Sequence, residues 1–141
     1  MTQQIEDLFR KFDHDIFALN HRQMSRFFAS PSIIYIENWQ RVLRSRGSLT
    51  SLIELYWCRL KSAGACSSEC SELNIEALPG MAFLTEAAVE FFDDCGDSLG
   101  AGELRMWMNL SDCGPRIELT EYTKLPMCLT PDDLARPRLL H

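Results

Sequence analysis

Residues 83–91 read FLTEAAVEF, and this stretch decides the fold class. Every second position from Phe83 to Phe91 is apolar or small, whereas Glu86 and Glu90 fall between these positions. A period of two places alternate side chains on opposite faces of a β-strand, whereas a helix repeats every 3.6 residues. The stretch therefore predicts a strand with one face against a core.

The same period of two is found on both sides of this strand. Short turn sequences that contain Gly or Pro separate four such segments, which cover residues 73–77, 83–91, 104–110 and 117–123. Consecutive strands joined by short turns pair in the antiparallel sense. We therefore expect an antiparallel meander in the second half of the chain.

Helical spacing dominates the first half. Apolar residues recur three and four positions apart over residues 3–20, which predicts an amphipathic helix. A short helix over 21–29, strands over 33–36 and 39–46, and a helix over 47–64 are expected to follow. This order predicts an α+β fold, with three helices packed on one face of a mixed, mostly antiparallel sheet of about six strands.

Length and composition are those of one globular domain. The chain has 141 residues, of which 46% are hydrophobic and 24% are charged. This is enough for a genuine core and excludes disordered and fibrous proteins. We expect one domain over 1–141, with its core at about 3–125 and a C-terminal tail over 126–141.

Charge and hydropathy argue against two classes of partner. The net charge is −6, and the one short basic cluster, Arg41, Arg44 and Arg46, lacks the motifs of nucleic-acid recognition. No apolar run approaches the ~20 residues that span a membrane. The N-terminus has early acids and no apolar signal segment. We therefore expect a cytoplasmic protein that binds neither nucleic acid nor membrane.

The six cysteines are expected to be reduced thiols. Cys66 and Cys70 are the closest pair, but four positions along a strand separate them by ~13 Å. That separation is too large for a disulfide or for a shared zinc ion. None of the three histidines is near this pair in sequence. We therefore expect no metal site and no cofactor.

A family resemblance rests on three short pieces of sequence: FFASPSIIYI at 27–36, Gly47 with Leu52-Ile53, and RIEL at 116–119. In these pieces and in its order of elements, the chain resembles the NTF2-like superfamily, which includes nuclear transport factor 2, SnoaL-like polyketide cyclases and ketosteroid isomerases. The resemblance covers about residues 3–125. It implies a cone, in which a strongly bent sheet wraps a long helix around one small-molecule pocket, and a homodimer through the outer face of the sheet.

The resemblance also implies a general base at the end of the first strand. Glu37, in IYIEN at 34–38, falls on that position. Alternation places Tyr35 and Glu37 on one face, and a carboxyl enclosed by Tyr35 and Trp57 would be desolvated and suited to proton transfer. The alternative is that Glu37 ends an edge strand and faces water.

The isomerase pattern further needs two hydrogen-bond donors for an oxyanion, and these positions fall at Asp15 and Met106. A methionine cannot donate, so ketosteroid isomerisation itself is not expected. Asp15 lies at the edge of the first helix's apolar stripe. It therefore faces either the mouth of the pocket or solvent.

Glu121 is the third candidate carboxyl. It follows the phase of Ile117 in a strand of period two, which predicts that it points inward. An inward Glu121 needs a partner, and the candidates are Arg105, Tyr35 and Glu37. A proton shared with Glu37 would supply one acid and one base. The alternative is that the strand end faces the other way, which exposes Glu121 and buries Tyr122.

Six large residues are expected either to line a ligand cavity or to fill the core: Phe12, Tyr35, Trp57, Phe83, Met106 and Met108. Arg105 and Trp107 fall on the opposite face of their strand. Trp and Arg are enriched at the centre of protein interfaces, so these two residues predict the dimer face.

Three functions stay open. The first is an enzyme of isomerase, cyclase or hydrolase type, whose pocket carboxylate acts as general acid–base on an apolar carbonyl compound. The second is a non-catalytic homodimeric binding or scaffold module with a filled core. The third is an adaptor, similar to nuclear transport factor 2, that binds partners on the sheet.

Overall fold

The computed structural model describes residues 2–36, 39–126, 129–131 and 134. In this part of the chain there are three helices and six strands: α1 (Thr2–Phe17), α2 (His21–Ser25), β1 (Phe28–Ile36), β2 (Trp39–Leu43), α3 (Arg46–Ser62), β3 (Ser67–Leu78), β4 (Ala82–Phe92), β5 (Ser98–Ser111) and β6 (Gly114–Lys124). The α+β class is as predicted.

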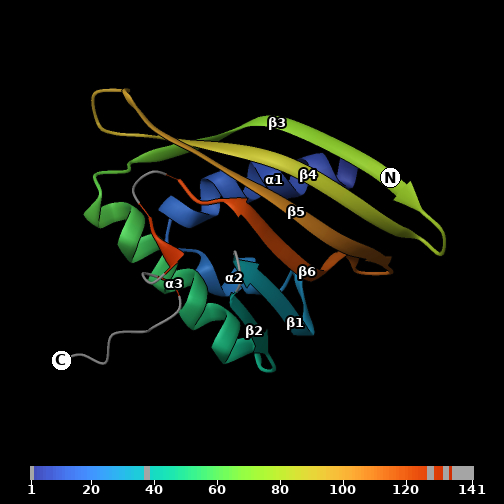
Figure 1. The fold of residues 1–141 in the computed structure, drawn as a ribbon. Helices are drawn as coiled ribbons and strands as arrows, with labels where there is room; N and C mark the ends of the chain where they lie inside the picture. Colours follow the sequence, from blue (N-terminus) through green and yellow to red (C-terminus); the bar gives the residue numbers. More distant parts are fainter. Residues whose placement is uncertain (1, 37–38, 127–128, 132–133, 135–141) are drawn as a thin grey trace.

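One sheet contains all six strands, in the order β2-β1-β6-β5-β4-β3. Strands β3 to β6 form the predicted antiparallel meander. Strand β1 pairs antiparallel with β2 and parallel with β6. This confirms a mixed, mostly antiparallel sheet, whose long strands β3, β4 and β5 pass over α1 (Figure 1).

The core lies between the helices and one face of the sheet. On α1, Ile5, Leu8 and Phe9 are buried at the spacing that the helical stripe predicts. They form one cluster with Leu49 and Leu52 of α3 and with the inward side chains of the sheet. We call this buried side of the sheet its inner face and the opposite side its outer face.

The second helix is shorter than its sequence pattern indicates. A helix was expected over 21–29, but α2 ends at Ser25, and Phe28 already belongs to β1. The reason is tertiary: the Ile117 N–H donates to the carbonyl of Phe27 at 2.8 Å, and Phe28 lies beside Ile117 in the parallel pair. Pairing with a distant strand therefore overrides the local helical spacing.

Strand β6 contains a bulge that changes which side chains face the core. Met108 pairs with Ile117, but the preceding Trp107 pairs with Leu119, so Glu118 is an extra residue. Ile117 and Thr120 are consequently both buried, although they are three positions apart. A bulge re-aims the side chains that follow it. The phase read from Ile117 is therefore wrong for the end of β6.

Part of the expected C-terminal tail belongs to the core. Leu129 and Leu134 are both buried, the first against the end of α3 and the second in the main cluster. Among the described cysteines, Cys58, Cys66, Cys70, Cys95 and Cys113 are free thiols, as expected. None of the described helices is both long enough and apolar enough to cross a membrane.

Candidate functional site

A cavity of about 120 Å³ lies between α1, α3 and the inner face of the sheet. Most of its wall is apolar, and the lining includes Phe9, Phe12, Ile34, Leu52, Leu104 and Met106. Five polar side chains also line it, namely Asp13, Tyr56, Ser68, Thr120 and Tyr122. An apolar concavity with a few converging polar groups is the usual form of a small-molecule site.

Helix α1 supplies the carboxyl of this cavity. Asp13 is four residues after Phe9 and three before Ile16, and all three residues line the cavity. Oδ1 accepts a hydrogen bond from the Ser68 hydroxyl at 3.0 Å, and Oδ2 accepts from the backbone N–H of Cys70 at 3.0 Å. Both partners belong to β3, so the carboxyl bridges the helix and the edge of the sheet.

Burial raises the pKa of the Asp13 carboxyl above its ordinary value. The hydrogen bonds from Ser68 and Cys70 oppose this shift, and the nearby Glu69 carboxylate adds to it. Asp13 therefore exchanges its proton closer to neutral pH than an exposed aspartate does. This is the property that a carboxyl needs for general acid–base work.

Strand β6 supplies two hydroxyls because its bulge turns Thr120 and Tyr122 inward. Thr120 is 2% exposed, and its Oγ1 has no hydrogen-bond partner among the described residues. Burial raises the pKa of the Tyr122 phenol to about 12, and a hydrogen bond with Tyr56 offsets part of that rise. Tyr122 is therefore protonated at neutral pH.

Comparisons with known proteins identify the fold. The chain matches no family model, and no curated protein matches it. Among solved structures, an NTF2-like protein with a cystatin-like fold from Novosphingobium aromaticivorans has a TM-score of 0.70 at 13% identity, over 88% of this chain and 81% of that chain. The chain has the NTF2-like fold.

Two further solved structures are similar to this chain in fold. A protein of unknown function from Nostoc punctiforme has a TM-score of 0.69 at 12% identity, over 89% of this chain and 91% of its own. The proposed beta subunit of an aromatic-ring-hydroxylating dioxygenase from Novosphingobium aromaticivorans has a TM-score of 0.59 at 14% identity, over 87% of this chain and 89% of its own. Identities this low establish a shared fold, and fold alone assigns no activity.

The residues that line the cavity differ in part from those expected from the sequence. Phe12 and Met106 line the cavity, whereas Phe83 and Met108 are buried in the core without being among its described lining residues. Trp57 lies elsewhere: its ring is 5.5 Å from the His21 ring, and the Lys61 ammonium is 5.0 Å from it. The side of a helix that faces the cavity depends on how α3 is rotated against the sheet, which its own sequence does not specify.

The first strand also has the opposite phase to the expected one. Ile34 and Ile36 line the cavity, so Tyr35 between them belongs to the outer face. Glu37, the expected general base, lies outside the described residues. The expected inward position is therefore wrong for Tyr35, and the role of Glu37 stays a prediction.

Glu121 does not enter the cavity. It follows the bulge of β6, and its Oε1 accepts a hydrogen bond from Nη2 of Arg105 at 2.6 Å. Both side chains are partly exposed, and Arg105 belongs to the outer face. The second of the two sequence alternatives therefore holds for Glu121, whereas Tyr122 is half-buried and lines the cavity.

Asp15 is buried, but it is not among the described residues that line the cavity. Its Oδ1 accepts from Asn20 Nδ2 at 3.2 Å and lies 3.2 Å from His14 Nδ1, and Oδ2 lies 3.3 Å from the Lys11 ammonium. Burial alone would raise the pKa of Asp15, but His14, Asn20 and Lys11 outweigh it and hold the pKa below its ordinary value. This geometry makes Asp15 a link between α1 and the turn that follows it.

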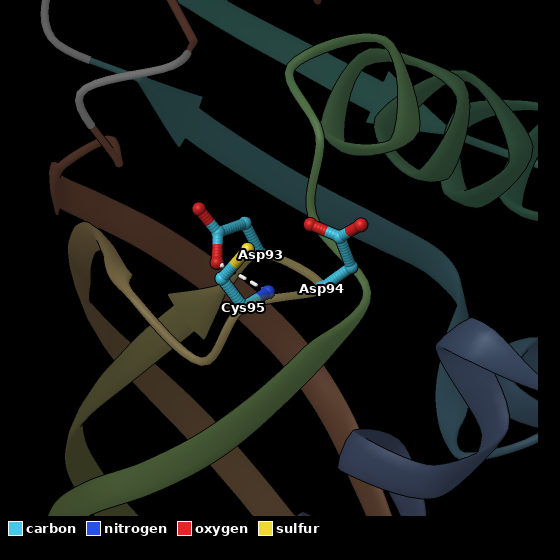
Figure 2. Close-up of side chains that lie close together, drawn as sticks. All are labelled: Asp93, Asp94 and Cys95. Carbon is cyan, nitrogen blue, oxygen red and sulfur yellow. Dashed lines mark hydrogen bonds between the residues drawn. The ribbon is translucent and has the colours of Figure 1, made fainter.

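Three side chains of kinds that commonly bind metal ions lie in the turn between β4 and β5. Asp93, Asp94 and Cys95 place their ligand atoms within 4.8 Å of one another (Figure 2). The turn itself uses Oδ1 of Asp93, which accepts the backbone N–H groups of Cys95 and Asp97 at 2.9 Å each. Asp94 and Cys95 are exposed. The geometry is accounted for by the turn, as expected of an aspartate in this position.

The sequence pattern does not predict the cavity residues Asp13 and Thr120, whereas the burial of Tyr122 is one of its two alternatives for the end of β6. Asp13 has a signal, because it occupies the stripe position between Phe9 and Phe17 where an apolar residue is usual. Thr120 has none, because the period of two from Ile117 assigns it to the other face until the bulge is known.

Proposed function

We propose that this protein binds a small, largely apolar molecule in the cavity between α1 and the sheet. The observation that carries the proposal is a cavity of about 120 Å³ with an apolar wall and a few polar groups. An apolar protein cavity of about 150 Å³ is known to bind benzene. A ligand with a single ring therefore matches the volume, whereas a steroid does not.

The proposal extends to proton transfer by Asp13. Each Asp13 oxygen accepts one protein hydrogen bond, which leaves one acceptor site on each oxygen. Its raised pKa brings the carboxyl nearer to the range in which a general base is effective. Asp13 thus takes the role for which Glu37 and Glu121 were candidates, removing a proton from a carbon next to a carbonyl group.

A ligand titration with a filled-cavity variant tests the binding proposal. Benzene and cyclohexanone at ten times their dissociation constant should add about 1.4 kcal/mol to the free energy of unfolding. This corresponds to a rise in Tm of roughly 4 °C. Val89→Phe, which fills the cavity from β4, should abolish the rise, whereas Val42→Phe at an exposed position of β2 should preserve it. No rise with either compound would contradict the proposal.

A separate measurement tests the proposed proton transfer by Asp13. The protein should accelerate exchange of the α-protons of cyclohexanone for deuterium in D₂O, followed by NMR. Asp13→Asn keeps a carbonyl oxygen for the Cys70 N–H but removes the base, so it should bind cyclohexanone without accelerating exchange. Binding with equal exchange rates in the two proteins would favour the non-catalytic binding module.

The outer face of the sheet favours a second role, self-association. Five apolar side chains are aligned there across neighbouring strands, in the order Leu84, Trp107, Leu119, Ile33 and Val42. Each is half-buried or exposed, and the Arg105 guanidinium lies 5.8 Å from the Trp107 ring centroid. We propose that a second copy of the chain covers this row, since Trp and Arg commonly anchor interfaces. A non-catalytic scaffold would use the same face.

A further inference from the structure

We infer that the Thr120 hydroxyl selects the ligand, and that the ligand is a single-ring molecule with one hydrogen-bonding oxygen, as in a phenol or a cyclic ketone. This inference rests on the proposed function, because it requires that the cavity bind a small molecule. It adds the residue that distinguishes one ring compound from another.

The first observation concerns the Thr120 hydroxyl, which lacks a hydrogen-bond partner in the part of the chain that the structure describes. Thr120 is 2% exposed, and no described residue gives its Oγ1 a partner. Buried hydroxyls are nearly always hydrogen-bonded, because an unmade bond leaves the cost of removing the group from water uncompensated. Thr120 lines the cavity while Oγ1 itself exposes less than 1 Å², so a ligand there becomes the partner once rotation about the Cα–Cβ bond turns Oγ1 to the cavity surface.

The second observation is the position of Thr120 in the sheet. It pairs with Met106 of β5 on one side and with Ile34 of β1 on the other, and both of these side chains line the cavity. The hydroxyl therefore lies in an apolar part of the wall. A hydrogen bond formed there is protected from competing water, so it discriminates well between ligands.

The third observation is the bulge in β6. Without the extra residue Glu118, the phase of Ile117 would turn Leu119 inward and Thr120 outward. The bulge thus places Thr120 in the cavity wall where regular pairing would place Leu119. Bulges are common next to functional sites, where they re-aim a side chain.

The other hydroxyls of the cavity already have partners, whereas each Asp13 oxygen keeps one free acceptor site, which a ketone oxygen cannot use when the carboxyl is ionised. The Ser68 hydroxyl donates to Asp13, and Tyr122 is hydrogen-bonded to Tyr56. Thr120 can both donate and accept, so it fits a ligand carbonyl or a ligand hydroxyl equally. The volume of about 120 Å³ limits the rest of that ligand to about one ring.

Two threonines provide a matched test. Thr85 is also buried and its Oγ1 also lacks a described partner, but it is not among the described residues lining the cavity. Thr→Val keeps the shape of either side chain and removes an unpaired hydroxyl, so both variants should fold. The dissociation constants of benzene, phenol and cyclohexanone are then measured by NMR titration for the wild-type protein, Thr120→Val and Thr85→Val.

In the wild-type protein, phenol and cyclohexanone should bind more tightly than benzene. Thr120→Val should reduce each preference by about two- to tenfold, the value of one net hydrogen bond, and leave benzene affinity within about twofold. Thr85→Val should leave all three affinities unchanged. Native-like NMR spectra of both variants show that any change is local.

Failure of this inference is distinguishable from failure of the proposed function. If none of the three compounds binds the wild-type protein, the proposed function fails and the inference falls with it. If they bind but Thr120→Val leaves the preferences unchanged, or Thr85→Val changes them equally, the inference is overturned and the binding function stands. An absence of preference for oxygen-bearing rings in the wild-type protein, as a water held by Thr120 would cause, also overturns it.

Discussion

The Asp13 carboxylate accepts the backbone N–H of Cys70 across 3.0 Å, and this bond joins α1 to the edge strand β3. It is made where β3 is irregular, because the pairing with β4 shifts between Cys70 and Glu72. The same carboxylate lines the cavity. The Asp13 side chain therefore joins the cavity wall to the edge of the sheet, and it carries a carboxyl whose pKa is raised by burial.

In the Asp13→Asn variant, the free energy of unfolding should fall less as the pH rises than it does in the wild-type protein. Because the pKa of Asp13 is raised in the folded protein, the folded state binds its proton more tightly than the unfolded chain. The free energy of unfolding therefore falls as the pH rises from below the ordinary Asp range through the raised pKa. Urea denaturation from about pH 3 to about pH 8 measures both curves. Parallel curves for variant and wild-type protein would contradict the burial of Asp13.

Asp15→Asn should have the opposite effect, and it controls for a general effect of removing charge from α1. The pKa of Asp15 is lowered in the folded protein, so its contribution to stability is present above the ordinary Asp pKa and is lost as the pH falls through the lowered value. The variant should lose about 1 kcal/mol at neutral pH, through weaker bonds to Lys11 and Asn20. The same denaturation series should show this loss shrinking in acid. A loss that grows in acid would be inconsistent with the contacts of Asp15.

Met106 and Met108 offer a comparison on one face of β5. Both are buried, but only Met106 is among the described cavity-lining residues. Each Met→Ala change should cost about 2–5 kcal/mol of unfolding free energy. Met106→Ala should also enlarge the cavity, so that a two-ring compound such as 2-naphthol raises the Tm of this variant only. An equal response of Met108→Ala would show that the two positions border one common space.

Trp107→Glu should convert the proposed dimer into a monomer. The change places a charge at the centre of the apolar row on the outer face, where desolvation is costly. Leu19→Glu is the control, because Leu19 is 58% exposed at the end of α1 and does not belong to the row. Light scattering coupled to size exclusion gives the mass of each protein. A wild-type mass equal to one chain, about 16 kDa, would contradict the dimer.

The sequence predicts the number and type of elements well because these depend on local periodicity. The stretch 83–91 forms strand β4, and the helical stripe at 3–20 forms α1, each within a few residues of the expected bounds. The resemblance to NTF2-like proteins likewise rests on element order, and the solved structures support it at the level of fold. The spacing of apolar residues predicts a helix or strand correctly when that element buries one whole face against the core.

The candidate site is less predictable, because it depends on which of the two alternating sets of side chains in a strand faces the core, and the alternation itself does not specify this. A shift of one residue exchanges the two faces of a strand. In β1 the inward residues are Ile34 and Ile36 rather than Tyr35. In β6 the bulge at Glu118 turns Thr120 toward the core and Glu121 away from it. Neither change alters the local pattern enough to be read from the sequence.

The amino-acid sequence alone determined that this chain forms an α+β domain with an antiparallel meander, since alternation and helical spacing are properties of neighbouring residues. Which residues share the cavity depends on how the helices and strands pack together. Asp13 reaches Cys70 because α1 crosses β3, and Thr120 faces inward because β6 gains one residue, Glu118, in its pairing with β5. These contacts join residues far apart in the chain, so they depend on the packing of the whole domain.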